Sequence, residues 1–545
     1  MKHFHLHLPD AGRDIYMPRK SQTWGYRYGP SIMCRGHICE IWFASPGDSF
    51  EADWFTYRRS EDDGKTWTEE RVIMSPVADS MDWFSVCDPA VIKYGDYYYI
   101  GYTSTVFSNG GGVCNNGFIS RSKSPTGPFE RWNGTGWGET RVSSDGTECH
   151  WIGRPAPLIY FDEDWHNWGA GEFSFVIKDE TIYIYYTWTS KDRDGKPIHE
   201  TRVATADITR EDWPATIVQR GVAVKRVNSG NDSYDMVYCE DLDKFIALST
   251  DRRFTQDSYL SVSESDDGIT YREVNRIKVN TGWMLHNCGI SGDEHHHIQS
   301  GDTLLLAYAY GNTWGCWGTR LHSYTFSAMD EDFHDETSLP NLHHEIEKWP
   351  DPETYSPTML YLEKPHFMRV QVGDTVKIPM MEGNVAYDMR PVIADVAFSN
   401  YDKDIATIAN GFLTAVAPGY TYVTATCGDR ACEFLVYVTE GEPDAWAFWQ
   451  PYPEKAVIDW KPLITDYHAS LSRREMKQVR GLATYADHSW FELCGTDGVT
   501  YENHSPELFD IREDGNVLPT GLCGRGSITV VCGEHRFDVS FTVEP

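Results

Sequence analysis

DYYYIGYTST at residues 96–105, followed by NNGFISRSKSPTGPF at 115–129, joins an apolar run to a second run that ends in a polar turn. Runs of β-branched and aromatic residues bounded by Gly, Asp, Asn and Pro are typical of β-strands. The same pattern occurs four more times, with first runs at 38–46, 181–190, 243–251 and 302–311. The chain is therefore predicted to repeat one antiparallel β-unit five times.

Landmark positions on the outer strands give the length of the repeat. Ser60, Ser122, Thr205 and Ser263 are 62, 83 and 58 residues apart, which is enough chain for a four-stranded sheet and its loops. Five such sheets in a radial array form a five-bladed β-propeller, so we predict an all-β propeller over residues 1–345. The alternating stretch HFHLHLP at 3–9 is a candidate for an extra strand that closes the ring.

The turn SEDDGKTW, from Ser60 to Trp67, also indicates a propeller. It matches the Ser-x-Asp-x-Gly-x-Thr-Trp pattern of the Asp box in sialidase-type propellers, and ESDDGITY at 264–271 is a degraded copy. We expect Asp62 to accept hydrogen bonds from backbone N–H groups of the turn and Gly64 to supply a positive φ. Asp62 is therefore predicted to be structural and to lie outside the active site.

The texture of the sequence changes after about residue 345. WPDPETYSP at 349–357 is predicted to be a linker. NYDKDIATIANGFLTAVAPGYTYVTATCG at 400–428 resembles a bacterial group 2 Ig-like domain, and 503–533 is a weaker copy. The resemblance implies two Ig-like β-sandwich modules at 356–440 and 455–545. The one stretch with helical character is 470–483.

The composition narrows the choice of partner. Lys and Arg number 48 and Asp and Glu number 81, which gives a formal net charge of −33. Nucleic acids and anionic membranes attract basic surfaces, so neither is expected as a partner. Aromatic residues make up 14% of the chain, with 20 Trp and 31 Tyr. They suit strand packing and sugar-binding clefts alike.

The cysteine count and the start of the sequence give expectations for the cellular compartment of the protein. There are 13 cysteines, so at least one thiol is free or paired between chains. MKHFHLHLPD lacks the apolar segment of a signal peptide, which predicts a cytoplasmic protein, or a secreted or cell-surface one if a signal has been trimmed. No cofactor is expected and no metal ion is favoured. The oligomeric state is left open.

The residues ahead of each inner strand are the candidate catalytic groups, because inner strands line the central pocket of a propeller. Asp88 begins DPAVIKYGDYYYIGYTS at 88–104, where the following proline fixes the backbone angle. Glu172 lies in GAGEFSFVIKDETIYIYYTW at the mouth of an apolar strand, where burial raises a carboxyl pKa. Asp235 heads the fourth repeat, and Asp232 is the competing choice.

The strands of Asp88 and Glu172 resemble those of glycoside hydrolase family 43 and related five-bladed enzymes, over about residues 25–330. The resemblance implies an exo-acting glycosidase that removes terminal arabinofuranosyl, xylosyl or galactosyl units from an oligosaccharide. It implies Asp88 as base or nucleophile, Glu172 as general acid and Asp235 as the carboxylate that tunes the acid. Phe173 and the third repeat, which has no matching Asp-Pro at 152–165, depart from the family pattern.

Further side chains are candidates for substrate binding. Arg27 in YRYGPSI resembles the Arg-Ile-Pro start of sialidases, and His286 at a strand start is placed to bond a sugar hydroxyl or the leaving group. His295, His296 and His297 cannot all face one metal from a single strand, because alternate side chains diverge. The complete set of binding candidates is Arg27, Trp24, His286, Asn287, Asp293, Arg154 and Trp317.

Three alternatives stay open from the sequence. A sialidase-like hydrolase needs three arginines around a carboxylate, for which Arg154 and Arg320 are candidate partners of Arg27. A metal-dependent carbohydrate deacetylase would use His286, Asp293 and a carboxylate of another blade. A non-catalytic glycan-binding propeller would bind the same sugars without turnover.

Overall fold

The computed structural model describes residues 2–47, 53–76, 82, 85–109, 112–139, 155–161, 167–192, 194–225, 230–343, 346–363, 367–384, 389–440, 445–447, 467–472, 477–478, 481–484, 490–493, 499–513, 515–532 and 535–544. These residues form strands almost throughout, and the one helix among them is the short 3₁₀ turn Trp213–Thr216. The all-β class is therefore confirmed. Across the described ranges, no helix has the length and apolar character to cross a membrane.

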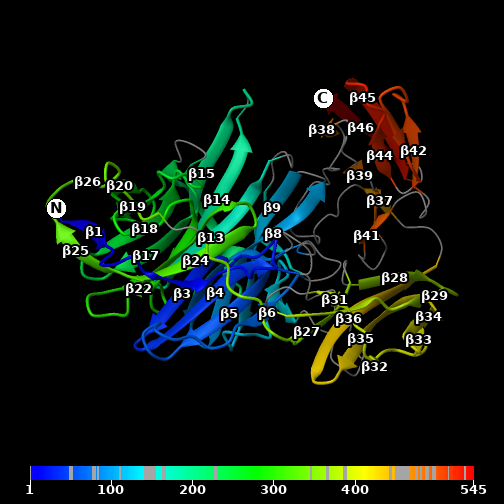
Figure 1. Cartoon of the computed structure of the whole chain (residues 1–545), viewed down its shortest axis with the longest axis horizontal. Helices are drawn as coiled ribbons and strands as arrows, with labels where there is room; N and C mark the ends of the chain where they lie inside the picture. Colours follow the sequence, from blue (N-terminus) through cyan, green and yellow to red (C-terminus); the bar gives the residue numbers. More distant parts are fainter. Residues whose placement is uncertain are drawn as a thin grey trace.

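Five groups of four paired antiparallel strands make up the first part of the chain (Figure 1). The second and third groups belong to one ten-stranded sheet, and the fourth belongs to a six-stranded sheet. From the inner to the outer edge, the first group is β3 (Tyr28–Arg35), β4 (Ile38–Pro46), β5 (Asp53–Ser60) and β6 (Arg71–Met74), and the second is β7 (Cys87–Tyr94), β8 (Tyr97–Asn109), β9 (Gly112–Ser122) and β10 (Glu130–Trp132). The third is β13 (Gly169–Lys178), β14 (Thr181–Lys191), β15 (Pro197–Asp207) and β16 (Val218–Lys225), and the fourth is β17 (Tyr234–Cys239), β18 (Lys244–Asp251), β19 (Tyr259–Ser265) and β20 (Arg272–Ile277). The fifth is β21 (Leu285–Ile290), β23 (Leu305–Thr313), β24 (Cys316–Ser323) and β2 (Arg13–Tyr16).

The inner strands form a closed ring. β3 contacts β7, β7 contacts β13, β13 contacts β17, β17 contacts β21, and β21 returns to β3. This is the arrangement of a five-bladed propeller, in which the strands alternate buried and pocket-facing side chains around one axis. Large aromatic side chains such as Trp42, Tyr102, Tyr185 and Tyr308 are buried in the blades. The aromatic excess of the sequence is thus largely the packing between blades.

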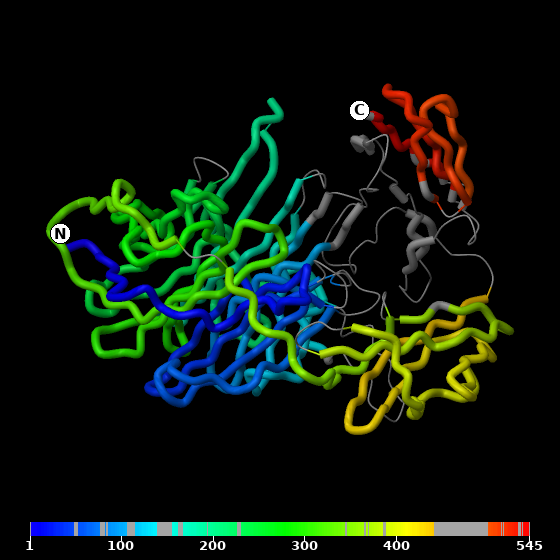
Figure 2. Tube along the Cα trace, viewed as in Figure 1, coloured from blue at the N-terminus to red at the C-terminus, as the bar shows by residue number. Residues whose placement is uncertain are grey.

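The N-terminal segment closes the ring differently from the prediction. β2 pairs with β24 and so completes the fifth blade. β1 (His3–His7) lies outside the blades and pairs with β25 (Thr325–Met329), far along the chain (Figure 2). The expectation that 3–9 closes the ring is therefore wrong. Phe4 and Leu6 are both buried in the core that the fourth and fifth blades share, so β1 covers that core and does not extend a blade.

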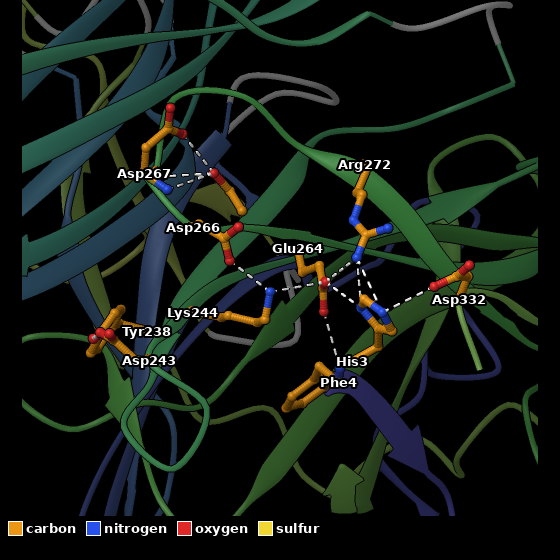
Figure 3. Close-up of polar contacts among 12 residues, drawn as sticks. His3, Phe4, Tyr238, Asp243, Lys244, Glu264, Asp266, Asp267, Arg272 and Asp332 are labelled. Carbon is orange, nitrogen blue, oxygen red and sulfur yellow. Dashed lines mark hydrogen bonds and ion pairs between the residues drawn. The ribbon is translucent and has the colours of Figure 1, made fainter. Parts of the chain in front are cut away.

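A buried carboxylate fixes β1 to the fourth blade (Figure 3). Glu264 on β19 is 1% exposed, and its Oε1 lies 2.7 Å from His3 Nδ1, 2.9 Å from Arg272 Nη2 and 3.1 Å from Lys244 Nζ. Its Oε2 accepts the backbone N–H of Phe4 at 3.1 Å. Burial alone would raise the pKa of Glu264, but these partners hold it below its ordinary value.

We expect Glu264→Gln to lower the free energy of unfolding by about 3 kcal/mol, because it removes the buried carboxylate that pairs with His3, Arg272 and Lys244, and leaves the buried Lys244 paired with the exposed Asp266. Urea denaturation measures the change. The matched control is Glu61→Gln, which breaks an exposed pair with Arg59 and should cost less than about 1 kcal/mol. Equal losses in the two variants would show that the network does not anchor β1.

His5 on β1 predicts a pH dependence of stability. Its ring centroid lies 3.9 Å from that of His7 and 4.4 Å from that of His334. Burial, then these two imidazoles, lower the pKa of His5 from 6.5 to about 4. The unfolded chain therefore binds a proton that the folded chain does not, so the stability contributed by His5 is complete above pH 6.5 and is lost as the pH falls towards 4.

The expected result is that Tm drops less between pH 7 and pH 5 in His5→Asn than in the wild type. Thermal unfolding at the two pH values measures the difference. The control is His37→Asn, because the His37 side chain is 83% exposed. If His5→Asn and His37→Asn follow the wild type equally, the His5 cluster has no part in acid sensitivity.

Two groups of strands with one common order follow the propeller. The first contains the sheet β28 (Phe367–Gln371), β36 (Arg430–Thr439), β35 (Gly419–Cys427) and β32 (Ala397–Ser399), and the sheet β29 (Thr375–Lys377), β34 (Phe412–Ala415) and β33 (Ala406–Ala409). The second contains β38 (Tyr467–Ser472), β46 (His535–Glu544), β45 (Gly524–Cys532) and β42 (Val499–Asn503), and β39 (Lys477–Gln478), β44 (Asn516–Pro519) and β43 (Phe509–Ile511). A three-stranded sheet accompanies each: β27 (Met359–Leu362), β30 (Met380–Gly383) and β31 (Arg390–Pro391), and β37 (Ala445–Ala447), β40 (Gly481–Thr484) and β41 (Trp490–Leu493).

Both groups have the layout of a β-sandwich. In each larger sheet, the strand that comes first in the chain pairs in parallel with the strand that comes last, as β28 does with β36 and β38 with β46. The helical expectation for 470–483 is wrong for the described part of that stretch, because β38 and β40 are strands held by pairing with β46 and with β37 and β41. Residues 473–476 and 479–480 lie outside the described residues. The module boundaries at 345, 356–440 and 455–545 stay predictions.

Candidate active site

A pocket on the propeller axis is lined by the inner strands of all five blades. Gly29 comes from β3, Asp88 from β7, Glu172 from β13, Asp235 from β17 and Asn287 from β21. Of the predicted site residues, the structure thus brings Asp88, Glu172, Asp235 and Asn287 into one pocket.

A β-bulge interrupts four of these strands at the pocket-lining residue. Pairing with the second strand shifts in register around Gly29, Asp88, Glu172 and Asn287. Their φ angles are 54°, 53°, 49° and 35°. The left-handed region costs a residue with a Cβ on the order of 1 kcal/mol or more, and bulges re-aim side chains beside active sites. The shared bulge thus places Asp88 and Glu172 at equivalent positions of adjacent inner strands, which makes the two carboxylates candidate functional side chains.

Thr103 on β8 links the two carboxylates. Its Oγ1 accepts the backbone N–H of Glu172 at 2.6 Å, and its hydroxyl donates to the carboxylate of Asp88. Thr187 on β14 donates to Glu172 Oε2 at 2.6 Å. The absence of a side chain at Gly171 permits this approach, because a Cβ there would overlap the Thr103 side chain. Each carboxylate is therefore oriented by a threonine hydroxyl.

Burial and the neighbouring charge of Glu172 raise the pKa of Asp88 well above its ordinary value, while the Thr103 hydroxyl opposes the shift. Two carboxyl groups in one water-poor pocket titrate as a pair, and the second proton is lost only at raised pH. A charged Glu172 therefore favours retention of the proton on Asp88. One acid and one base side by side are what proton transfer to a leaving group requires.

Asp232, at the start of the fourth inner strand, is the centre of a second network. It is 1% exposed; Oδ2 lies 2.8 Å from His286 Nδ1 and accepts the Asn287 N–H at 3.0 Å, while Oδ1 lies 3.0 Å from Arg253 Nη1. Burial would raise its pKa, but Arg253 and His286 hold the pKa of Asp232 well below its ordinary value. Asp232 is thus an anion that fixes a cation and an imidazole at the pocket.

Asp235, the predicted tuning residue, ties three blades together. Its Oδ1 accepts from Ser174 Oγ at 2.7 Å, and its Oδ2 accepts the Ile290 N–H at 2.8 Å. Burial raises its pKa despite these bonds. The charge of Asp232 contributes to the raised pKa of Asp88. Asp235, which lines the pocket, and Asp232 are therefore both candidates for the third carboxylate.

An aromatic wall surrounds His286. Its ring centroid lies 4.7 Å from Trp317, 4.8 Å from Phe254, 5.4 Å from Tyr28 and 6.0 Å from Trp314. Tyr28 donates its hydroxyl to Asp53 Oδ2 at 2.8 Å. The predicted Trp24 joins the same cluster behind Trp317. The wall offers flat apolar faces beside the carboxylates, as sugar rings require.

The arginines of the sialidase alternative do not converge. Arg27 is 1% exposed, its guanidinium is paired with Glu70, and it lies 4.3 Å from the ring of Tyr16. Arg320 is held by Asp14 on the outer strand of the fifth blade. The prediction that Arg27 binds substrate is therefore wrong, since Glu70 neutralises it inside the blade. Arg154 lies outside the described residues.

Asp293 and the histidine run lie at the other end of the propeller axis from His286. His286 is near the start of β21, whereas Asp293 follows its end and caps a turn by accepting the His295 N–H at 2.8 Å. Backbone carbonyls of this segment accept N–H groups from the ends of four inner strands: Gly292 from Cys34, Glu294 from Lys93, His295 from Ile177 and His296 from Tyr238. Asp293 is therefore not a pocket residue, and its pairing with His286 around a metal is wrong. No metal-binding group of three or more His, Cys, Asp or Glu occurs in the part of the chain described.

Sequence reasoning missed Arg253, Thr103 and Thr187. A signal for the threonines exists, because Thr187 follows Glu172 by 15 residues and Thr103 follows Asp88 at the same separation, each after a tyrosine. In a hairpin, such a spacing returns the chain to a position beside the carboxylate. Arg253 has no comparable pattern, since it lies in the turn after β18.

Neither family models nor curated proteins match this sequence. Solved structures are similar at low scores. A family 117 glycoside hydrolase of the marine bacterium Zobellia galactanivorans is 13% identical, over 60% of this chain and 90% of that one, with a TM-score of 0.38. An α-L-arabinofuranosidase from Podospora anserina, in complex with cellotriose, is 10% identical over 59% and 99%, with a TM-score of 0.39. A thermostable family-43 glycoside hydrolase is 13% identical over 62% and 100%, with a TM-score of 0.37.

Proposed function

We propose that the protein is a glycoside hydrolase whose catalytic pair is Asp88 and Glu172. The observation that carries the proposal is the bulged, strained placement of both carboxylates on adjacent inner strands, with Thr103 between them. The oxocarbenium-like transition state of glycoside cleavage needs one carboxyl group to protonate the leaving oxygen and a second to attack or to activate water.

Glu172 is the general acid and Asp88 the base or nucleophile in this proposal. Because Thr103 Oγ1 already accepts the Glu172 N–H, its own proton is available to Asp88. Thr187 donates in the same way to Glu172, so each carboxylate is held by one hydroxyl, and the assignment of the two roles comes from the resemblance of their strands to those of family 43. Asp232 takes the tuning role first assigned to Asp235 in this proposal, because it holds Arg253, whose charge acts on the proposed acid Glu172.

The substrate is an oligosaccharide from which a terminal arabinofuranosyl, xylosyl or galactosyl unit is removed. The pocket on the propeller axis supports exo action, since a segment from Gly292 to His296 spans the opposite end. The aromatic wall supports a neutral sugar. Arg27 is buried and paired with Glu70, which argues against sialic acid as the donor sugar.

A panel of aryl glycosides with pentosyl, hexosyl and sialyl donors, and of acetylated sugars, separates the candidate functions. We expect release of the aryl group from a pentoside or hexoside, with no loss in the presence of a chelator. Acetate release that a chelator abolishes would replace the proposal by a metal-dependent deacetylase. Binding without turnover of any donor would replace it by a glycan-binding propeller.

A further inference from the structure

We propose that Trp314 is the platform on which the sugar beyond the cleaved bond stacks, so that the enzyme selects sugar leaving groups over small ones. The inference rests on the proposed function and deepens it. Trp314 is the residue that, in this proposal, sets the preference for a sugar as leaving group.

Trp314 stands out from the aromatic wall by its exposure. It lies in the turn between β23 and β24 and is 52% exposed, whereas Trp317 beside it is 2% exposed. Its ring centroid is 5.1 Å from Trp317, 5.6 Å from Phe254 and 6.0 Å from His286. A single exposed apolar residue is ordinary, but an exposed indole continuous with buried pocket aromatics extends the binding face outwards.

The backbone around this platform is built to keep it in place. Gly315 has a φ of 74°, and a Cβ there would lie 2.5 Å from the ring of Trp24, so Trp24 fills the space beneath the turn. Phe254 has a φ of 59°, a strained angle for an aromatic residue, and its N–H donates to Leu285 O at 3.1 Å. The strain at Phe254, beside the glycine turn at Gly315, points to a site where the positions of the rings matter.

The wall adjoins the general acid. His286 is bonded to Asp232, and Asp232 to Arg253. The charge of Arg253 interacts with Glu172 and, less strongly, with Asp88. Tyr28 at one end of the wall is a neighbour of Asp88, whereas Phe254 at the other end, beside Trp314, lies 5.4 Å from the Arg253 guanidinium and so on the Glu172 side. Because Glu172 protonates the leaving oxygen in the proposed function, the Phe254 end of the wall contacts the leaving group. Trp314 is the outermost member of that wall.

The test compares two substrates with the same donor sugar: a disaccharide, and the glycosyl fluoride, whose leaving atom is too small to reach Trp314. We expect Trp314→Ala to lower kcat/KM for the disaccharide about tenfold through KM, the range of one stacking contact. The value for the fluoride should change less than about twofold. Trp314→Phe keeps a flat face and should retain most of the disaccharide activity.

Phe333→Ala is the matched control, because Phe333 is 40% exposed and packs on Arg276 of the fourth blade. It should leave both substrates unchanged. Equal losses on disaccharide and fluoride, or no loss on either, would overturn the platform while hydrolysis by the wild type leaves the proposed function standing. Failure of the wild type to cleave either substrate from arabinosyl, xylosyl or galactosyl donors would instead contradict the proposed function.

Discussion

Glu172→Gln is expected to abolish cleavage of sugar–sugar bonds while sparing glycosyl fluorides. An amide cannot protonate a leaving oxygen, and general acid catalysis contributes about 10²–10⁴-fold, so kcat/KM for a disaccharide should fall by about 10³. Fluoride leaves without protonation, so its hydrolysis should fall by less than about tenfold. Asp88→Asn removes the base or nucleophile and should lower both rates by at least about 10³.

Steady-state kinetics on the two substrates measure these losses. The matched control is Glu180→Gln, because Glu180 follows the same strand, has a φ of 65° and is exposed away from the pocket. It should retain wild-type rates. Near wild-type activity of Asp88→Asn or Glu172→Gln on the disaccharide would contradict the catalytic assignment. A loss of activity on the fluoride alone, in either variant, would contradict the assignment of Glu172 as acid and Asp88 as base or nucleophile.

Asp232→Asn and Arg253→Met are expected to move the pH–rate profile in opposite directions. The charged and titratable groups that act on the pair are Asp53, Tyr28, Cys87, Asp232 and Arg253. Removing the charge of Asp232 leaves Arg253 unopposed, which favours the ionised carboxyls and moves both limbs to lower pH. Removing Arg253 has the reverse effect. Shifts of about one pH unit correspond to about 1.4 kcal/mol.

Asp232→Asn should also lower kcat/KM by about 10²-fold, because His286 and Arg253 lose the carboxylate that positions them. Asp235→Asn is the competing variant and should move the profile less, since its oxygens serve Ser174 and Ile290. A profile that Asp235→Asn shifts and Asp232→Asn leaves unchanged would return the tuning role to Asp235.

The strands and the positions of the two proposed catalytic carboxylates were predictable from the local sequence pattern. The run 38–46 coincides with β4, and 181–190 lies within β14, because aromatic and β-branched residues alternate there without regard to distant contacts. Asp88 and Glu172 were predictable for the same reason, since each precedes an apolar inner strand. The strand pattern depends only on neighbouring residues, so the folded chain keeps the strands that it predicts.

Features that depend on distant partners were not predictable. Arg27 was misread because Glu70, which neutralises it, is brought close only by the pairing of the first blade. β1 was misplaced because Glu264, far along the chain, supplies its anchor. The bulges at Asp88 and Glu172 are register shifts between two strands, and neither strand carries the shift in its own sequence.

Chromatography of arabino-, xylo- and galacto-oligosaccharides after incubation with the purified protein tests the central claim most directly. The claim is that Asp88 and Glu172 cleave a glycosidic bond together. The wild type should release a monosaccharide from at least one of these series, and Asp88→Asn and Glu172→Gln should release none above the uncatalysed background. The claim would be contradicted if both variants released as much monosaccharide as the wild type, or if the wild type released none from any series.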